Sequence, residues 1–144
     1  MIDIVYKLTK ADLTTYLGYQ YVIGKEHVFP GTGPICSSGY SHAYLSPAMA
    51  VLMNPIHAGF QNPRLWKAEG SILVRDGVLK VGCSPITLIK ELAMPAISLD
   101  QRVAFAIACT WLTADEQWRL WASDWLTGKN RSRAASAASA SASA

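Results

Sequence analysis

Runs of β-branched and aromatic residues alternate with turn-forming residues along the first part of the chain. Residues 2–8, IDIVYKL, have the composition of a β-strand, and residues 16–23, YLGYQYVI, have the same composition. The next stretch, residues 25–36, is interrupted by Pro30, Gly31, Gly33 and Pro34. Because proline and glycine break regular structure, the pattern predicts two strands followed by a loop.

A short helix is expected directly after this loop. Ser46 is a favoured N-cap residue, and Pro47 occupies the first helical position, where its missing N–H costs nothing. Residues 48–53, AMAVLM, continue as good helix formers, and Asn54-Pro55 is expected to end the helix. The pattern therefore predicts about two helical turns.

The middle of the chain has the pattern of an antiparallel meander. Residues 64–74, RLWKAEGSILV, alternate in part between apolar and polar side chains, and residues 75–77, RDG, are a hairpin signal. Residues 78–83 return as a strand, and residues 85–92, PITLIKEL, are expected to form a third strand.

The spacing of the apolar residues changes in the last third of the chain, where it predicts two helices. Ser98-x-x-Gln101 has the form of a capping box ahead of RVAFAIACTWL, and Thr113-x-x-Glu116 has the same form ahead of QWRLWASDWL. Gly128 stands where the C-terminus of a helix favours a left-handed residue.

Three tryptophans form one stripe along the second of these helices. Trp118, Trp121 and Trp125 fall at i, i+3 and i+7. Such a stripe is more often core than a binding platform, and this helix is expected to cover one face or edge of the sheet. The same stripe is also a candidate interaction surface.

The elements together predict an α+β fold, with a small, mostly antiparallel β-sheet, one short helix inserted, and two C-terminal helices. A single domain is expected over residues 1–128, with a sheet part at 1–95 and a Trp-rich helical part at 96–128. Residues 129–144, KNRSRAASAASASASA, are a basic tail rich in alanine and serine.

The formal net charge of +3 comes from this tail and not from the body of the chain. Lys129, Arg131 and Arg133 account for it, because residues 1–128 contain ten basic and ten acidic side chains. The basic residues of the body are scattered singly, so no phosphate-binding face is indicated and sequence-specific nucleic acid is not an expected partner. The three tail cations join the tryptophan stripe as candidate interaction residues.

The N-terminus and the cysteines favour a reducing compartment. No apolar run approaches the roughly 20 residues of a membrane-spanning helix, and Asp3 stands where a signal peptide carries basic residues, so neither a membrane nor secretion is expected. Cys36, Cys83 and Cys109 show no C-x-x-C spacing. Free, mostly buried thiols are therefore expected, without a disulfide framework or a metal knuckle.

The densest group of reactive side chains is CSSGYSHAYLSP, residues 36–47. Cys36 and His42 are of types that zinc accepts, although C-x5-H matches no standard half-site. Cys36 is also a candidate nucleophile if a histidine lies within reach. The order of Tyr6-Lys7 in an early strand, then Tyr40-Ser41-His42, then Glu69 and Glu91 is similar to that of ADP-ribosyltransferase-like enzymes, although the early strand lacks their arginine or histidine. The resemblance implies Tyr40, His42 and Glu69 as a catalytic set on a nicotinamide dinucleotide.

An architectural interpretation of the same segment requires less chemistry and is the one we favour. It places Cys36 and Tyr44 in the interior, makes a turn at Gly39, and has His42 hydrogen-bond to the backbone so that the loop is held over the helix start. On this interpretation no cofactor and no metal are expected, and an enzyme is less expected than a binding protein.

Several stretches resemble a widespread family of small phage and bacterial proteins. The resemblance rests on GYQYVIGKEHVFPG, CSSGYSHAYLSP and RLWKAEGSILV, followed by LKVGCSPITLIKEL and the alanine-rich RSRAASAASA. Members of that family carry a G-[FY]-[QRK]-Y-x-x-G-K segment and a C-x-x-G-[FY]-H motif, whereas here Ser41 separates Tyr40 from His42. The likeness runs in order through about residues 5–135.

The resemblance implies a phage-type origin and a small accessory role. With the neutral body, it predicts a non-enzymatic protein that acts by protein–protein interaction, most simply as a minor virion or assembly component. A host-takeover or anti-defence factor that binds a host protein is the alternative within this class. An ADP-ribosyltransferase-like, nucleotide-modifying enzyme is the alternative from another class. The expected location is the virion or the host cytoplasm, with a homo-oligomer or larger assembly left open.

Overall fold

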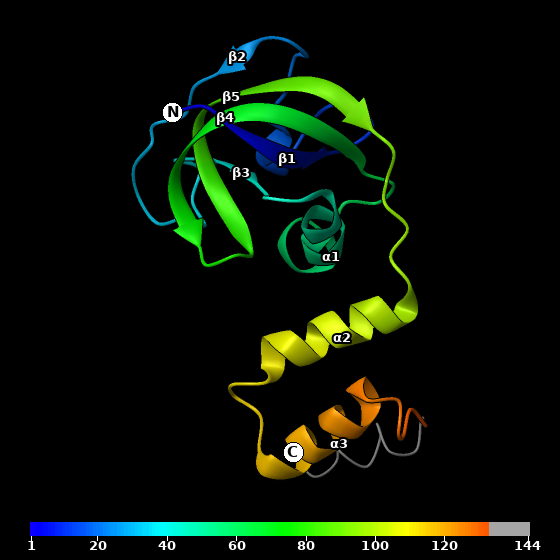
Figure 1. Cartoon of the computed structure of the whole chain (residues 1–144). Coiled ribbons are helices and arrows are strands. Elements are labelled where there is room, and N and C mark those ends of the chain that lie inside the picture. Colours follow the sequence, from blue (N-terminus) through cyan, green and yellow to red (C-terminus); the bar gives the residue numbers. More distant parts are fainter. Residues whose placement is uncertain (133–144) are drawn as a thin grey trace. The chain divides into compact units, whose positions relative to one another are not determined.

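Three helices and a five-stranded antiparallel sheet make up residues 1–132, the part of the chain that the computed structural model describes (Figure 1). The chain forms two compact units, Met1–Ile97 and a second unit that begins at Ser98. The sheet and one helix belong to the first unit, and the other two helices belong to the second. The predicted α+β fold is confirmed.

The sheet of the first unit curls so that β3 and the edge strand β1 come together. Its strands have the order β1-β4-β5-β2, and β3 also pairs with β5. Tyr6 in β1 and Tyr44 just after β3 form an isolated bridge with two backbone hydrogen bonds of 2.8 Å, so β3 also joins β1 (Figure 1). The strands are β1 (Asp3–Thr9), β2 (Glu26–His27), β3 (Ser41–Ala43), β4 (Arg64–Asp76) and β5 (Lys80–Leu92).

Strands β4 and β5 form one long hairpin of two 13-residue strands. The prediction of two separate strands at 78–83 and 85–92 was therefore wrong. Strand β5 continues through Pro85 because Ser84 and Pro85 together lie opposite Ser71 alone. A bulge of this kind leaves no ladder hydrogen bond for a proline to break. The Ser84–Pro85 peptide bond is cis.

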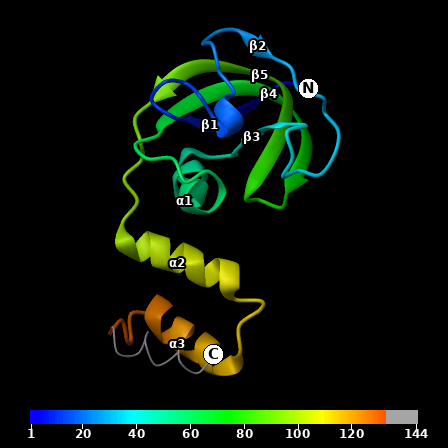
Figure 2. The same cartoon turned by 180° about the vertical axis from the view of Figure 1, so that it is seen from behind.

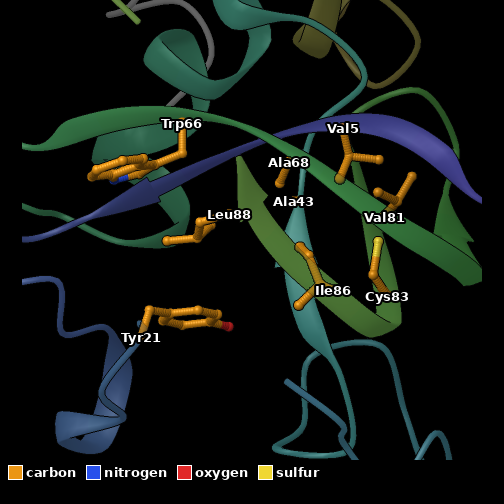
Figure 3. Packing of buried hydrophobic residues seen from close by; sticks show 9 residues of the cluster. All are labelled: Val5, Tyr21, Ala43, Trp66, Ala68, Val81, Cys83, Ile86 and Leu88. Carbon is orange, nitrogen blue, oxygen red and sulfur yellow. The ribbon is translucent and has the colours of Figure 1, made fainter. Parts of the chain in front are cut away.

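Alternate residues of the strands build one core (Figure 3). Val5 lies opposite Ala68 and Lys7 lies opposite Trp66 in the register of β1 with β4, so these four side chains share a face. Trp66 is the largest of them and is 1% exposed. The buried apolar cluster consists of Val5, Tyr21, Ala43, Trp66, Ala68, Val81, Cys83, Ile86 and Leu88.

Helix α1 (Pro47–His57) begins where the sequence predicts and ends later. The Ser46 hydroxyl caps it by accepting a backbone N–H at 3.1 Å, as expected. The predicted stop at Asn54-Pro55 was wrong, because a proline near the C-terminal end removes only one helical hydrogen bond. The Asn54 carbonyl accepts the N–H of Ala58, which completes the last turn.

The chain between β1 and β3 has little regular structure. The strand predicted at residues 16–23 was wrong, since Tyr16–Gly18 forms a short 3-10 turn, η1, and the chain then folds back. An isolated bridge between Thr14 and Gln20 closes this loop. Residues 28–40 form a second, wider loop at the edge of the first unit, drawn in cyan in Figure 2. It leads into β3, which composition alone did not indicate.

Helix α2 (Leu99–Thr110) opens the second unit with the capping box that the sequence predicts. The Ser98 hydroxyl accepts the N–H of Gln101 at 3.2 Å, and the Gln101 side chain accepts the N–H of Ser98 at 2.8 Å. Two backbone donors at the helix start are thereby satisfied.

Helix α3 (Glu116–Leu126) starts from a different cap than predicted. Asp115 accepts the N–H of Trp118 at 2.7 Å, while the Thr113 hydroxyl donates to a carbonyl at the end of α2. The capping box expected at Thr113 was therefore wrong, because the carboxylate nearer to the helix provides the cap. Gly128 follows the helix with φ of 76°.

Candidate functional site

The side chains at the centre of the CSSGYSHAYLSP motif hold residues 28–40, here called the polar loop. His42 donates from Nε2 to the Ile35 carbonyl, and Tyr40 donates its hydroxyl to the Gly33 carbonyl at 3.2 Å. Burial lowers the pKa of His42 below its ordinary value, which favours the neutral imidazole. The prediction that His42 hydrogen-bonds to the backbone is confirmed, with the Ile35 carbonyl as its partner.

Glu69, the third residue of the enzyme alternative, lies elsewhere on the sheet. It is exposed and lies opposite Thr87 of β5. His42 lies opposite Gly82, five residues away along the same strand and beyond the bulge at Ser84 and Pro85. The sheet register thus places the glutamate apart from the histidine.

The cysteines are placed differently from the prediction. Cys83 is buried, but Cys36 and Cys109 are exposed, so the expectation of mostly buried thiols was wrong for two of the three. Tyr44, the other motif residue expected inside, is buried. Cys36 is exposed because the polar loop runs over the surface. The Nζ of Lys80 lies 3.0 Å from its Sγ.

A lysine lies inside the core of the first unit. Lys7 is 5% exposed, and its Nζ donates to the His42 carbonyl at 2.8 Å. The same Nζ lies 5.0 Å from the centre of the Tyr21 ring, whose hydroxyl is 2.7 Å from Ser41 Oγ. Burial lowers the pKa of Lys7 to about 8, against a smaller opposing effect of Cys83. Among residues 1–132, Lys7 forms no ion pair.

The sequence contains a signal for this lysine that composition conceals. The strand period of two that turns Val5 inward also turns Lys7 and Thr9 inward, and all three are buried. The buried hydroxyl of Thr9 accepts a hydrogen bond from Trp66 Nε1 at 3.0 Å. The interior thus includes polar groups that a hydrophobicity pattern would place outside.

Residues 10–25, here called the tip loop, carry two strongly exposed apolar side chains at their turn. Tyr16 and Leu17, the apolar tip, are 80% and 83% exposed. Leu17 has φ of 56° and ψ of 23°, in the left-handed region that non-glycine residues seldom adopt. Leu13 also has a positive φ, of 66°, but its side chain packs against the core. Of these two leucines, only Leu17 adopts the left-handed conformation without burying its side chain.

Short hydrogen bonds fix the tip loop internally. Asp12 accepts from the N–H of Thr14 at 2.9 Å and from its hydroxyl at 2.7 Å. These bonds lower the pKa of Asp12. On the far side of the apolar tip, the N–H of Thr15 donates to the Tyr19 carbonyl at 2.9 Å. The tip therefore projects from a closed turn.

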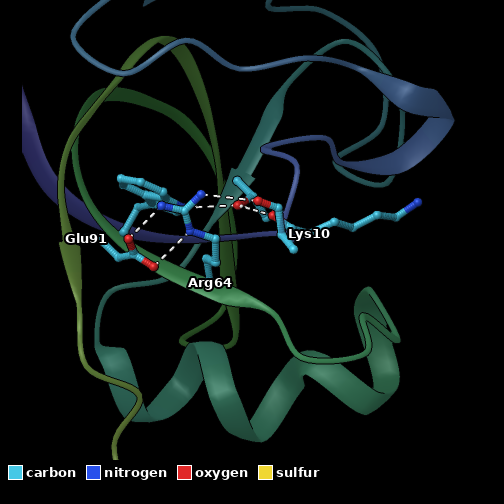
Figure 4. Close-up of polar contacts among 6 residues, drawn as sticks. Lys10, Arg64 and Glu91 are labelled. Atoms are coloured by element: carbon cyan, nitrogen blue, oxygen red, sulfur yellow. Dashed lines mark hydrogen bonds and ion pairs between the residues drawn. The ribbon is translucent and has the colours of Figure 1, made fainter.

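Arg64 fixes the base of the tip loop (Figure 4). Its Nη1 donates to the Ala11 carbonyl at 3.2 Å, and its Nε and Nη2 bind the two carboxylate oxygens of Glu91 at 2.8 and 2.6 Å. Hydrogen bonding within this pair raises the pKa of Arg64 and lowers that of Glu91. Because both side chains are partly exposed, the pair contributes orientation more than stability.

A groove with a volume of about 630 Å³ lies beside the apolar tip. Tyr16, Leu17 and Phe60 are its large apolar lining residues, and Lys10 and Asp12 are its charged ones. Phe60 is held by the Asn54 side chain, which donates to its carbonyl at 3.0 Å and accepts its N–H at 3.1 Å. Lys10 Nζ lies 6.0 Å from the centre of the Phe60 ring. The groove thus combines apolar walls with one charge of each sign.

The tryptophan stripe packs within the second unit. Trp125 is 8% exposed and forms a small core with Ile107 and Ala122, against which Trp118 and Trp121 are partly buried. This agrees with the expectation that such a stripe is more often core than binding surface. A role for it in an interface stays a prediction.

The predicted basic interaction residues have partners inside the same unit. Lys129 pairs with Asp124 at 3.1 Å, and Arg131 pairs with Asp100 at 2.6 Å. The Arg131 guanidinium also lies 4.6 Å from the ring of the last tryptophan in the stripe. Arg133 and the rest of the Ala/Ser tail lie outside the described residues.

No protein family, no curated protein and no solved structure was found to match the chain. Within residues 1–132, none of the helices is both long and apolar enough to cross a bilayer. The same part of the chain contains no group of three or more His, Cys, Asp or Glu side chains that could hold a metal ion.

Proposed function

We propose that the protein binds a partner protein through the apolar tip and the groove beside it. The observation that carries this proposal is Leu17, which is 83% exposed and has φ of 56°. A left-handed leucine costs roughly 1–2 kcal/mol relative to the right-handed conformation. An exposed side chain does not recover that cost by packing. Backbone conformations of this kind cluster at functional sites, where the surrounding structure holds them in place.

The groove has the chemistry of a pocket for one anchoring side chain. Tyr16, Leu17 and Phe60 offer apolar surface to an aromatic or aliphatic group of the partner. Lys10 and Asp12 flank that surface and would orient polar groups next to the anchor. Tyrosine is among the residues that interfaces favour, since it contributes large contact area and a hydroxyl.

The tip loop is ordered before any partner arrives. The turn at Asp12 and the contact of Arg64 with the Ala11 carbonyl hold the loop from within and from its base. Binding to a preorganised loop avoids most of the ordering cost that a flexible loop would incur.

The sequence motifs favour a phage setting for this binding activity. GYQYVIGKEHVFPG, residues 18–31, begins at the apolar tip, and CSSGYSHAYLSP contains β3. On the resemblance of these motifs to the phage and bacterial family, the protein acts as an accessory component of a virion or its assembly. The alternative is a factor that binds a host protein in the host cytoplasm. The ADP-ribosyltransferase-like alternative has less support, because Tyr40 and His42 bind loop carbonyls.

Photocrosslinking from the apolar tip tests the proposal. The full chain, with a photoreactive phenylalanine analogue in place of Tyr16, is irradiated in an extract of the cells in which the protein is expressed. The adducts are identified by mass spectrometry. We expect one dominant adduct that Leu17→Asn removes, because asparagine tolerates the left-handed backbone but removes the apolar contact. The control Val78→Ser removes a side chain that is 71% exposed at another turn, and it should keep the adduct.

An adduct pattern that Leu17→Asn leaves unchanged would contradict binding through the tip. Mass spectrometry of purified phage particles distinguishes a virion component from a factor that binds a host protein. A virion component is present in fixed copy number, whereas a host-directed factor is absent from the particles.

A further inference from the structure

We infer that Cys36 and Lys80 form an oxidation-sensitive pair, which a hydroperoxide converts into a covalent sulfur–nitrogen link. The two atoms that would join, Cys36 Sγ and Lys80 Nζ, are 3.0 Å apart although the residues are separated by 44 positions in the sequence. Neither residue lines the groove or belongs to the apolar tip. The pair is therefore a modification site separate from the proposed binding surface.

Lys80 is an unusual cation because it is buried without an acidic partner. It begins β5 and is 6% exposed. Asp76 faces it across the hairpin, yet none of the ion pairs within residues 1–132 includes Lys80. The hydrogen-bond partner of its ammonium in this part of the chain is Cys36 Sγ. The Lys80 side chain is thus directed at a thiol and not at a carboxylate.

The polar loop holds the thiol at this buried nitrogen. Ile35, the residue before Cys36, accepts the hydrogen bond from His42, and Tyr40 binds the Gly33 carbonyl on the same loop. Cys36 itself is exposed, so a small oxidant in solution can reach its sulfur. One partner is thus accessible to peroxide, while the other is shielded and aimed at the product of that oxidation.

The chemistry balances with a hydroperoxide as the oxidant. With hydrogen peroxide, the Cys36 sulfur attacks one peroxide oxygen and the O–O bond breaks, so that one water departs and the cysteine becomes a sulfenic acid. The Lys80 ammonium passes one proton to the sulfenic acid oxygen, its nitrogen attacks the sulfur, and the remaining extra proton is released after the bond forms. The S–N bond forms, the S–O bond breaks, and the oxygen leaves as a second water. The sulfur loses two electrons and the peroxide gains them.

The product would tie the polar loop to the start of β5. Such a link closes a covalent ring through 44 sequence positions, and a cross-link of that kind restricts the unfolded chain as a disulfide does. Because thiols attack oxidised sulfur, excess reductant should restore the free pair.

Peptide and intact mass spectrometry of the full chain test the inference. With hydrogen peroxide, we expect a species about 2 Da lighter than the reduced protein, containing a peptide pair joined through Cys36 and Lys80, which dithiothreitol reverses. In Lys80→Arg the charge stays but the guanidinium does not condense, so Cys36 should instead gain about 16 or 32 Da of oxygen. Cys109, the other exposed thiol, serves as the control within the same chain.

The oxidation products of the wild-type chain test the inference even if Lys80→Arg folds poorly. Oxygen addition at Cys36 to the same extent as at Cys109, with the Lys80 peptide unmodified, would overturn the inference. A Cys36–Cys36 disulfide between two chains as the main product would overturn it as well.

Discussion

The polar loop and the tip loop of the first unit use their side chains in opposite ways. Tyr40 and His42, which bear most of the reactive-looking chemistry, point their polar atoms at carbonyls of the polar loop. The tip loop leaves Tyr16 and Leu17 in solvent, and the backbone at Leu17 has a conformation that disfavours leucine. The difference teaches that a site is marked by what the fold leaves unsatisfied, and not by how reactive a segment looks.

The physical basis of the difference is the cost of burying polar groups. A loop that packs over a sheet must pair its donors and acceptors, so the polar residues of such a loop serve each other. A loop tip that faces water has no such requirement. Single exposed apolar side chains are common on protein surfaces. An exposed apolar side chain on a strained backbone is uncommon, and it therefore suggests a binding partner.

The largest effect should come from adding one methyl group to the polar loop. A Cβ at Gly39 would lie 1.9 Å from the Thr32 carbonyl oxygen, whereas a Cβ at Gly18 in the tip loop would meet nothing within 4 Å. Gly39→Ala should therefore destabilise the protein by about 3 kcal/mol or more. Gly18→Ala, which suffers only from φ of 72°, should cost about 1 kcal/mol. Urea unfolding measures both, and equal losses would contradict the contrast.

Local signals in the sequence predict the existence of the three helices and the turn between β4 and β5, but not the unbroken course of β5 through Pro85. The caps at Ser46 and Ser98 have a short-range cause, a hydroxyl that accepts a nearby N–H, and they are found where expected. The turn at Tyr16–Gly18 was missed because YLGYQYVI has strand composition, and its only warning is Gly18. Strand or turn here depends on the Thr14–Gln20 bridge, which composition does not report.

The candidate site was less predictable because it depends on contacts between distant segments. His42 hydrogen-bonds to the backbone, as the architectural interpretation expects, whereas the bond from Tyr40 to the Gly33 carbonyl was not predicted. The groove joins the tip loop to the chain after α1, and Lys80 meets Cys36 across 44 positions. Such juxtapositions follow from sheet register and leave no periodic trace in a single sequence.

Lys7 supports the polar loop from inside the core, because its ammonium donates to the His42 carbonyl, but the buried charge lowers the stability of the fold. Lys7→Met removes a buried charge but leaves the His42 carbonyl without its donor. With the pKa lowered from 10.5 to about 8, the charge penalty is about 3 kcal/mol, and the lost hydrogen bond offsets about 1–2 of these. Lys7→Met should therefore stabilise the protein by about 1–2 kcal/mol at pH 7.

The pH dependence identifies the cause. Above pH 8 the folded chain releases the Lys7 proton while the unfolded chain keeps it up to about 10.5, so wild-type stability should rise relative to Lys7→Met over that window. The difference is clearest between pH 8 and 9, before Cys83 titrates in the unfolded chain. Lys90→Met, at an exposed position of β5, should show no such change. A pH-independent difference for Lys7→Met would refute a buried charge.

A smaller effect separates the two left-handed leucines. Leu17→Asn should stabilise the fold by about 1 kcal/mol, since asparagine accepts φ of 56° and little burial is lost. Leu13→Asn gains the same backbone relief but loses packing against the core, so it should destabilise. Thermal and urea unfolding of both variants test this. Destabilisation by Leu17→Asn would mean that the tip is held for the fold and not for a partner.

The smallest effect should appear in the polar loop as the pH falls. Burial lowers the pKa of His42 below the 6.5 of an unfolded chain, so between 6.5 and the folded value the unfolded chain binds the proton that the folded chain resists. Stability should therefore decrease as the pH falls through that window, and it should be restored above 6.5. His42→Gln keeps an N–H donor for the Ile35 carbonyl without a titrating group, so it should lose this part of the pH dependence.

His57→Gln is the matched comparison, because the pKa of His57 is also lowered by burial but its side chain does not hold the polar loop. Unfolding free energies at pH 5.5 and 7.5 measure the effect, and hydrogen exchange assigns it to a segment. If exchange rises in the tip loop and not in residues 28–40, His42 does not have the supporting role described for it.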